Sequence, residues 1–380
     1  MSKFKSRIDK LLISTGGNPF ITSKSEDLFY FSGFTGDFGY IVLDNQKSHL
    51  ITVKMFEEEA MNFVDKSLFD IHIVEKKDIF SRIVDVLLGI GSEDIYICSN
   101  DTRLSGFISV VECAKDKKLF GLNKKLLSLR DDHFSIGNIK VFFKEEITQK
   151  VRAIKDADEI ETIKNNILLS DEGFLYILKV VKSGMTELQV SAELEYYLKS
   201  KGAEGMSFPT IVASGSRSSM PHARSSNKVI SNGEPVVIDF GIKKDMYCTD
   251  TTRTIFIGQL SQKLKDTYNV VLEALNEGIA SARAGISVGE VDRKVRSVIQ
   301  RNGLGDYFIH STGHGVGLEI HEYPYLSQWN NYELQEGMVV TIEPGIYIPG
   351  EFGIRIENMV LIGKNSCEVL TNLKTDPVVI

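Results

Sequence analysis

The sequence has few cysteines and lacks any long apolar run. The four cysteines stand far apart without Cys-x-x-Cys spacing, at Cys98, Cys113, Cys248 and Cys367. They indicate neither a zinc site nor a disulfide framework, and we expect reduced, mostly buried thiols. No window approaches a membrane span, and the opening residues lack the apolar core of a signal peptide. These absences predict a cytoplasmic protein without membrane association.

A strong charge of one sign is also missing. The formal net charge is −7 at pH 7, and no block of basic residues occurs, so nothing indicates a nucleic-acid partner. The chain does have 380 residues, of which 42% are hydrophobic and 25% charged. This length and composition predict a globular protein with two domains.

Two acidic residues fall within a predicted β-hairpin. Residues 235–242 and 246–257 are rich in Val, Ile, Phe, Tyr and Thr, as is typical of strands. With the turn centred on Lys244-Asp245, Asp239 would lie opposite Asp250. Two opposed, buried carboxylates destabilise a strand pair unless a cation lies between them. The hairpin therefore predicts a metal-binding pair.

A second hairpin repeats this arrangement further along the chain. Residues 339–343 and 353–357 flank a predicted tip at Pro349-Gly350, and pairing about Gly350 places Glu343 opposite Glu357. Singly, such acids are more typical of turns and strand ends than of sites. Their shared spacing and surroundings favour a common site.

One histidine lies between the two hairpins in the sequence. His314 stands in a segment whose Gly313, Gly315 and Gly317 disfavour a helix. His310 and His314 are therefore not a helical i, i+4 ligand pair, and the glycines allow the backbone to approach a crowded site.

Four carboxylates and one imidazole predict a centre for two divalent ions: Asp239, Asp250, His314, Glu343 and Glu357. Such a donor set favours Mn²⁺, with Co²⁺, Fe²⁺ or Zn²⁺ as alternatives. Two ions share and activate a water molecule and polarise a carbonyl group. Cys248 shares the face of Asp250 by strand parity, but the hard ions that carboxylates prefer give it no ligand role.

Residues 1–140 are predicted to form an α/β domain. Apolar patterns predict strands at 40–43, 49–53, 71–74 and 95–98, and a helix at 78–88. His49, His72 and His133 have no acidic or histidine neighbours arranged as a site, so we expect surface or core histidines without a catalytic role.

The domain boundary is predicted between residues 137 and 151, which gives domains 1–140 and 141–380. Residues 151–164 carry Ile154, Ile160 and Ile163 at helical spacing among alternating charges. This pattern predicts an exposed helix with one packed face at the start of the second domain.

An internal repeat occurs in the second domain. Residues 184–190 and 285–291 each contain a glycine, an apolar residue, a Thr or Ser, and a Gln or Glu three positions later. Both match the capping box that begins a helix. Capping boxes are common, but each of these precedes a hairpin with a carboxylate pair. The repeat predicts two αβ units related by a pseudo-twofold axis, with the metals at the axis.

The motifs resemble those of the pita-bread metallopeptidases, which include aminopeptidase P, prolidase and methionine aminopeptidase. The matching strings are Ile-Asp-Phe-Gly, Thr-Asp-Thr-Thr-Arg-Thr, His-Ser-Thr-Gly-His-Gly-Val-Gly-Leu-Glu-Ile-His-Glu, Ile-Glu-Pro-Gly-Ile-Tyr and Arg-Ile-Glu-Asn. The resemblance is strong over about residues 150–380 and looser before them, where residues 31–36 resemble a loop of aminopeptidase P relatives. It implies an α+β fold: a C-terminal pita-bread (creatinase/aminopeptidase) domain with pseudo-twofold αβ repeats, preceded by a smaller creatinase-like α/β domain.

The same resemblance implies a role for each ligand. Asp239 holds one metal, His314 and Glu343 hold the other, and Asp250 and Glu357 bridge the two. Glu343 also transfers a proton from water to the leaving nitrogen.

Four further residues match family positions outside the ligand set. They are His222, His310, His321 and Arg355, and the resemblance implies that they line the pocket beyond the scissile bond and steady the intermediate.

The resemblance implies a metal-dependent Xaa-Pro aminopeptidase, a homodimer, acting on peptides with proline at the second position. The Xaa-Pro amide lacks an N–H, so it requires a dedicated pocket. An Xaa-Pro dipeptidase (prolidase) is the alternative within the family. A metal-free hydrolase like creatinase and a non-catalytic binding module are alternatives of other kinds, and the complete ligand set counts against both.

Overall fold

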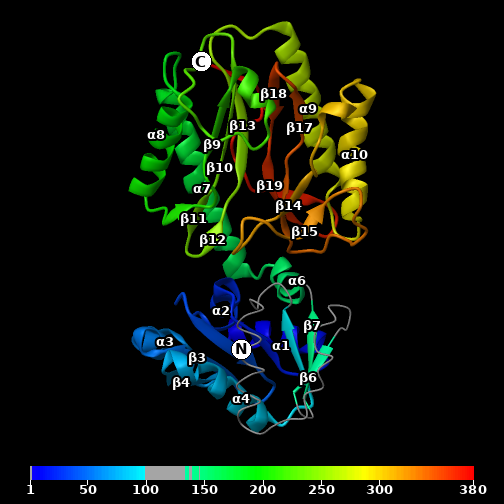
Figure 1. The fold of residues 1–380 in the computed structure, drawn as a ribbon. Coiled ribbons are helices and arrows are strands. Elements are labelled where there is room, and N and C mark those ends of the chain that lie inside the picture. Colours follow the sequence, from blue (N-terminus) through cyan, green and yellow to red (C-terminus); the bar gives the residue numbers. More distant parts are fainter. Residues whose placement is uncertain (1, 99–132, 137–138, 145) are drawn as a thin grey trace. The chain divides into compact units, whose positions relative to one another are not determined.

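The computed structural model describes residues 2–98, 133–136, 139–144 and 146–380 (Figure 1). Two compact units, Met1–Arg152 and Ala153–Ile380, form the chain. Strand β7 (Ile139–Lys144) pairs with β5 (Asp94–Cys98) in the first unit, so that unit continues beyond residue 140. The predictions for the side chains of Cys98, Cys113 and His133 lie outside what the structure describes.

The first unit contains a seven-stranded mixed sheet in its described part, with strand order β4-β3-β2-β1-β5-β7-β6. The other strands are β1 (Phe20–Thr22), β2 (Gly39–Leu43), β3 (Ser48–Val53), β4 (Phe69–Val74) and β6 (His133–Ile136). The helices are α1 (Lys3–Ser14), α2 (Ser25–Ser32), α3 (Glu57–Phe63), α4 (Ile79–Ile90) and α6 (Ile147–Ala153), with 3₁₀ turns η1 (Lys54–Phe56) and η2 (Lys76–Asp78). All four predicted strands are confirmed, and so is the helix predicted at 78–88.

Helix α4 shows how the sequence builds this unit. Its buried residues, which include Ile79, Ile83 and Leu87, recur at helical spacing and pack on the sheet through Ile51 and Ile95. The helix ends where Gly91 takes a left-handed conformation.

Two histidines of the first unit lie together, which the sequence did not indicate. Strands β3 and β4 run in parallel, and Nδ1 of His49 is 3.0 Å from Nε2 of His72. Asp70 lines the same cavity of about 440 Å³ and pairs with Lys47 at 2.6 Å. The prediction that these histidines have no histidine or acidic neighbour is wrong, because strand pairing joins positions 23 residues apart.

The prediction of a single helix over residues 151–164 is also wrong, because two helices share this segment. Helix α6 ends at Ala153, and Ile154 forms an isolated bridge with Met338. Asp156 then caps α7 (Ala157–Val180) in a capping box with Glu159. The chain forms two helices because this cap starts a new one.

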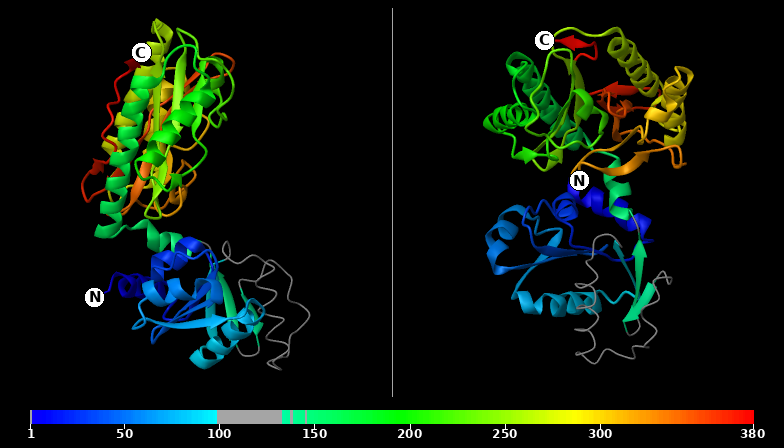
Figure 2. Two further views of the ribbon diagram at one scale, coloured as in Figure 1. Left: turned by 90° about the vertical axis from the view of Figure 1, so that its left-hand side faces the viewer. Right: turned by 45° about the horizontal axis from the view of Figure 1, so that its top comes forward.

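The second unit consists of two similar halves (Figures 1 and 2). The first half contains α7, α8 (Glu187–Ser200), β9 (Ile211–Ser214), β10 (Pro235–Phe240), β13 (Thr251–Phe256), β21 (Val378–Val379), and the smaller β8 (Gly205–Met206), η3 (Gly215–Ser219), β11 (Ile242–Lys244) and β12 (Tyr247–Cys248). The second contains α9 (Gln262–Ser281), α10 (Val288–Arg301), η4 (Gly305–Tyr307), β14 (Gly313–Gly315), β15 (Glu322–Leu326), β16 (Val339–Ile342), β17 (Gly345–Ile348), β18 (Phe352–Arg355), β19 (Asn358–Ile362) and β20 (Cys367–Val369). The main sheets have the orders β21-β13-β10-β9 and β15-β14-β16-β19-β20.

Each half packs a helix pair against its own sheet. Figure 1 shows α7 and α8 beside β9, β10 and β13, and α9 and α10 on the other side of the unit. The first half buries a core that includes Phe174, Leu194 and Phe240. The core of the second includes Val295 and Val340. No helix in the described part of the chain is both long and apolar enough to span a membrane.

The predicted repeat is confirmed as a helix cap in both halves, but only the first copy forms the full capping box. Thr186 caps α8 in a full capping box, and the Ser287 hydroxyl caps α10. Just before these caps, the Gly184 amide donates to the carbonyl of residue 230, and the Gly285 amide donates to that of residue 334, each at 2.9 Å. Equivalent backbone hydrogen bonds therefore precede α8 in the first half and α10 in the second.

Candidate metal centre

The first hairpin carries Asp239 and Asp250 on one face. Asp239 lies directly opposite Thr252, not Asp250, so its partner is two residues from the predicted one. The two residues at the tip, Asp245 and Met246, have positive φ angles of 49° and 69°, which centres the turn one bond later than predicted. Asp250 lies two residues from Thr252 and thus stays on the face of Asp239.

The second hairpin has the predicted register. Strands β16 with β19 and β17 with β18 follow one continuous pairing, which places Glu343 opposite Glu357. Gly350 at the tip has a φ of 75°. The prediction that these two glutamates face each other is confirmed.

His314 lies on strand β14, as its glycine-rich surroundings predicted. A Cβ at Gly313 would come within 2.0 Å of the Thr341 carbonyl oxygen, so only glycine lets the strands approach there. The His314 Nδ1 is 3.1 Å from the Gly315 carbonyl oxygen. Because a carbonyl can only accept, Nδ1 carries the proton and Nε2 offers a free lone pair.

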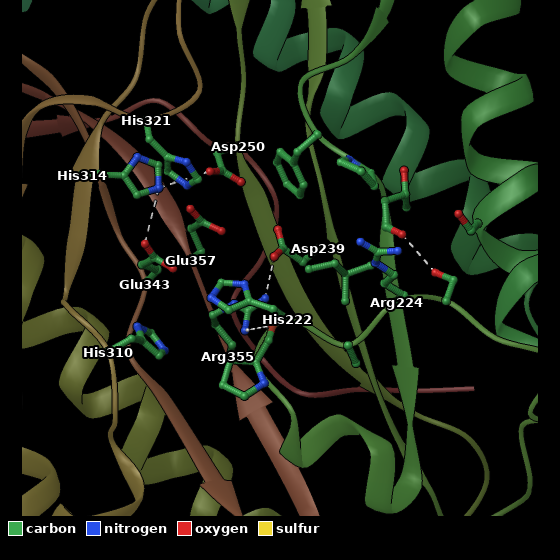
Figure 3. A pocket seen from close by; sticks show the side chains of 18 of the residues that line it. His222, Arg224, Asp239, Asp250, His310, His314, His321, Glu343, Arg355 and Glu357 are labelled. Carbon is green, nitrogen blue, oxygen red and sulfur yellow. Dashed lines mark hydrogen bonds and ion pairs between the residues drawn. The ribbon is translucent and has the colours of Figure 1, made fainter. Parts of the chain in front are cut away.

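The nine predicted site residues line one cavity of about 840 Å³ (Figure 3): His222, Asp239, Asp250, His310, His314, His321, Glu343, Arg355 and Glu357. The His314 Nε2 lies 3.4 Å from Asp250 Oδ2 and 3.5 Å from Glu343 Oε1. Asp250, His314 and Glu357 each place one donor atom within 4.8 Å of the others. The structure therefore brings together every residue that the sequence singled out.

The electrostatics of this cluster favour a cation. Burial and the nearby Asp239 raise the pKa of Asp250 well above its usual value, and burial and Asp250 do the same for the pKa of Glu357. Burial also raises the pKa of Glu343 to about 8. One oxygen of Asp239 and one of Glu357 are buried without a hydrogen-bond partner. Divalent ions would satisfy these oxygens and offset the repulsion, so the residues fit a metal.

Arg355 is hydrogen-bonded to one carboxylate of the cluster directly and is linked to a second through a threonine. Its Nη2 donates to Asp239 Oδ2 at 2.5 Å, its Nη1 to the Tyr347 hydroxyl at 2.6 Å, and its Nε to Thr252 Oγ1 at 3.1 Å. The Thr252 hydroxyl in turn donates to Glu357 Oε2 at 2.7 Å. One buried guanidinium thus holds one acid from each hairpin in place.

Tyr347 and His310 extend this network. The His310 Nδ1 is 2.8 Å from the Ser311 carbonyl oxygen, so it donates there and Nε2 accepts from the Tyr347 hydroxyl at 2.9 Å. Burial lowers the pKa of His310 to about 3 and raises that of Tyr347 to about 12. Both groups are neutral at pH 7, and both nitrogens of His310 are engaged within the protein.

The sequence analysis missed Tyr347 and Thr252. Tyr347 has the same strand parity as Glu343, and it lies on the same hairpin face as Arg355. Strand parity in the second hairpin could therefore have predicted that Tyr347 faces the site. Thr252 was missed because the predicted pairing of the first hairpin placed Asp250 opposite Asp239 instead of Thr252.

The remaining two histidines border the cavity. The ring of His321 packs edge-on against that of His314, with centroids 4.3 Å apart. Burial and the neighbouring His314 lower the pKa of His321 to about 4. His222 lies on the exposed loop after η3. Their imidazoles are open to the cavity, where they can donate to a bound substrate.

Cys248 takes no part in the cavity lining. Its thiol donates to the Leu318 carbonyl at 3.7 Å, and burial raises its pKa to about 11. Cys248 and Cys367 are free thiols, as the sequence predicted.

Comparison with known proteins places these features in context. The model of metallopeptidase family M24 matches residues 161–364, and that of the creatinase/prolidase N-terminal domain matches residues 6–121. The Xaa-Pro dipeptidase of Pyrococcus furiosus is 36% identical over 98% of this chain and 99% of its own length. The uncharacterized peptidase YqhT of Bacillus subtilis is 35% identical over 96% of this chain and 94% of its own.

Solved structures show the same likeness. The Xaa-Pro dipeptidase from Bacillus anthracis superposes with a TM-score of 0.89 and 32% identity, covering 99% of this chain and 100% of that one. The X-Pro aminopeptidase from Thermotoga maritima gives a TM-score of 0.85 and 34% identity, covering 98% and 100%. The predicted fold class is thereby confirmed.

Proposed function

The chain belongs to metallopeptidase family M24, and from this premise we propose that it is a metal-dependent peptidase that hydrolyses Xaa-Pro bonds. One observation carries the proposal: four carboxylates and one imidazole from both halves converge on a single cavity with buried, unpartnered carboxylate oxygens. The names of the relatives support the specificity for proline.

The proposed ligands of two divalent ions, with Mn²⁺ as the expected metal, are Asp239, Asp250, His314, Glu343 and Glu357. Asp239 would hold one ion, His314 and Glu343 would hold the other, and Asp250 and Glu357 would contribute oxygens to both. When bound, the ions supply Lewis acidity and a water molecule of lowered pKa. The carboxylate-rich donor set supports a hard divalent ion.

Glu343 is the proposed proton carrier. Its buried carboxylate lines the cavity beside the other proposed ligands, and burial favours its protonated form by raising its pKa to about 8. Such a group is suited to accept a proton from water and deliver it to the proline nitrogen. That nitrogen must gain a proton before the C–N bond breaks, because an amine leaves far more readily than an amide anion.

The neighbouring side chains hold and polarise the substrate. His222 and His321 are the proposed hydrogen-bond donors to the carbonyl oxygen as negative charge develops there. Arg355 keeps Asp239 oriented through its 2.5 Å bond. His310 acts by fixing Tyr347, which supports Arg355.

Metal removal and replacement test this function. We expect chelated protein to lose cleavage of Ala-Pro and Ala-Pro-Ala, and added Mn²⁺ or Co²⁺ to restore it, while Ala-Ala is not cleaved. Cleavage of Ala-Pro alone defines a dipeptidase, and cleavage of the tripeptide defines an aminopeptidase. Glu343→Gln should abolish turnover, whereas Glu336→Gln, an exposed acid outside the cavity, should not. Absence of metal-dependent cleavage of both proline substrates contradicts the proposal.

The family resemblance also supports a cytoplasmic homodimer as a proposal. Sedimentation equilibrium of the full chain tests the dimer, and cell fractionation tests the location.

A further inference from the structure

The cavity contains a second guanidinium with a different environment. Arg355 is buried and bonded to Asp239 and Tyr347. Arg224 also lines the cavity, but it is exposed, and its side chain forms no hydrogen bond or ion pair with any residue that the structure describes. Among the described lining residues, Arg224 is thus the arginine still free to bind an anion.

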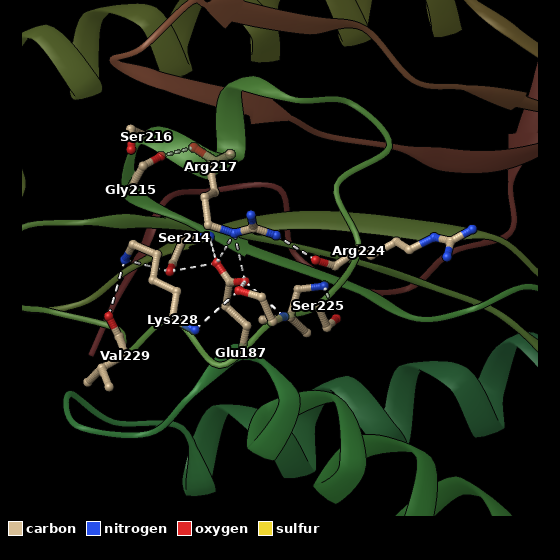
Figure 4. A network of polar contacts seen from close by, with 12 residues as sticks. Glu187, Ser214, Gly215, Ser216, Arg217, Arg224, Ser225, Lys228 and Val229 are labelled. Atoms are coloured by element: carbon tan, nitrogen blue, oxygen red, sulfur yellow. Dashed lines mark hydrogen bonds and ion pairs between the residues drawn. The ribbon is translucent and has the colours of Figure 1, made fainter.

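The backbone around Arg224 is nevertheless firmly held (Figure 4). The Arg217 Nη2 donates to the Arg224 carbonyl oxygen at 2.6 Å. Ser225 Oγ donates to the Thr210 carbonyl and accepts from the amide of residue 212, both at 2.9 Å. The amide and hydroxyl of Ser226 donate to Glu187. Three consecutive residues of this loop are therefore fixed.

Glu187 is the centre of this clamp. Its side chain is fully buried, and it also accepts from the Ser214 amide and from Arg217 Nε at 3.0 Å. In Figure 4 the guanidinium of Arg224 extends away from this cluster. The loop thus holds the backbone that carries Arg224 in place, while its guanidinium is not used internally. The planar shape of the guanidinium lowers the entropy lost per hydrogen bond that it forms with a ligand.

Among the residues that the structure describes, no acid forms an ion pair with Arg224. Glu195 lines the same cavity, but it accepts from Ser191 at 3.4 Å and lies 3.9 Å from Lys199. In the view of Figure 3, Asp239 lies between Arg224 and His314. Arg224 follows His222 by two residues, and both line the cavity. The positive charge is therefore next to a proposed substrate-binding residue.

We propose that Arg224 binds the free α-carboxylate of proline and so makes Xaa-Pro dipeptides the preferred substrates. This inference rests on the proposed function. A planar guanidinium matches a carboxylate with two parallel N–H donors. In a longer peptide the same position holds a neutral amide, which forms only a weaker, uncharged hydrogen bond.

The test compares Ala-Pro with Ala-Pro amide, which differ in this one charge. We expect Mn²⁺-loaded wild-type protein to prefer Ala-Pro in kcat/KM by roughly tenfold or more, the usual scale for a charge-assisted hydrogen bond. Arg224→Gln should lose this preference mainly through a higher KM for Ala-Pro. Arg224→Lys, which keeps the charge but not the fork, should retain part of it. Arg293→Gln, an exposed arginine on α10 outside the cavity, should keep the wild-type preference.

The outcomes separate this inference from the proposed function. If Arg224→Gln binds metal normally and still prefers Ala-Pro as strongly as wild type, the assignment of Arg224 is wrong while the peptidase activity stands. A wild-type preference for the amide also overturns it. If wild-type protein cleaves neither compound, the proposed function itself fails. Circular dichroism and metal content measured on each variant exclude misfolding as the cause of any change.

Discussion

The Tyr347 hydroxyl joins two buried groups of the site. It accepts from Arg355 and donates to His310, and its ring lies within the protein at 2% exposure. The benzene ring of phenylalanine would fit the same space, so a change here tests the hydroxyl alone.

We predict that Tyr347→Phe leaves Arg355 Nη1 and His310 Nε2 without their shared partner. Leaving such groups unsatisfied typically costs about 1–3 kcal/mol. We therefore expect a lower free energy of unfolding in urea, together with a lower kcat because Arg355 holds Asp239 less firmly. Tyr196→Phe, at a position 74% exposed, is the matched control and should change neither. An unchanged stability and kcat in Tyr347→Phe would show that the network contributes nothing.

At the scale of elements, a buried ion pair ties the start of the second unit to its sheet. Lys155, which follows α6, has its Nζ 2.6 Å from Glu322 Oε1, and both side chains are 1% exposed. Lys155 also bonds through its backbone to Gly337. The segment before α7 is thus anchored to the second half of the unit.

We predict that Lys155→Ala destabilises the protein by about 3–5 kcal/mol, because the charge of Glu322 is left buried without its partner. Lys164→Ala removes a pair with Glu368 whose side chains are 40% and 55% exposed, and it should cost at most about 1 kcal/mol. Thermal and urea unfolding measure both. Similar small losses in the two variants would contradict the prediction.

The histidine pair of β3 and β4 predicts how the first unit responds to acid. Burial lowers the pKa of both His49 and His72 below 6.5; Asp70 opposes this at both, whereas Arg82 adds to it at His72. Below that pH the folded state holds fewer protons than the unfolded chain, so stability falls as the pH falls.

We therefore expect His72→Gln to lose less thermal stability than wild type when the pH is lowered from about 7 to about 5. The melting temperature of each protein at both pH values is the measurement. Equal losses in the two proteins would show that this pair does not titrate on unfolding.

Several elements could be predicted from local sequence, and the exceptions have physical reasons. The second hairpin was predicted in register because Pro349 and Gly350 mark its tip. The turn of the first lies one residue later than predicted, because Met246, a residue type uncommon at positive φ, occupies it. The break before α7 was missed although Asp156 and Glu159 form a recognisable capping box.

At the scale of the whole molecule, the repeat of residues 184–190 in 285–291, together with the two hairpins that each carry a carboxylate pair, predicted two equivalent halves. The Glu187 clamp was not predictable, because it joins positions 27 to 39 residues apart through loops without periodic patterns. The contact between His49 and His72 was not predicted either, because it joins residues 23 positions apart on neighbouring strands. Local patterns indicate elements, whereas contacts between distant segments require the fold.

The buried carboxylates of the proposed metal centre make the free energy of unfolding depend on pH. Burial raises the pKa of Glu343 from 4.5 to about 8, and the pKa values of Asp250 and Glu357 are raised too. Without metal, the folded protein therefore holds more protons than the unfolded chain, and its free energy of unfolding falls as the pH rises towards 8. His310 and His321, with pKa values lowered to about 3 and 4, are neutral in the folded state and mostly neutral in the unfolded chain above pH 7, so they oppose this trend only weakly.

Metal ions compete with the same protons, because only ionised carboxylates bind them. We therefore predict that the rise in melting temperature on adding Mn²⁺ to chelated protein is larger at about pH 8.5 than at about pH 7, while the metal-free protein melts lower at the higher pH. Calorimetry with and without Mn²⁺ at both pH values measures this. Glu343→Gln removes one titrating group and should weaken the pH dependence. A metal-induced rise that is equal or larger at pH 7 would mean that the buried carboxylates are already ionised before the metal binds.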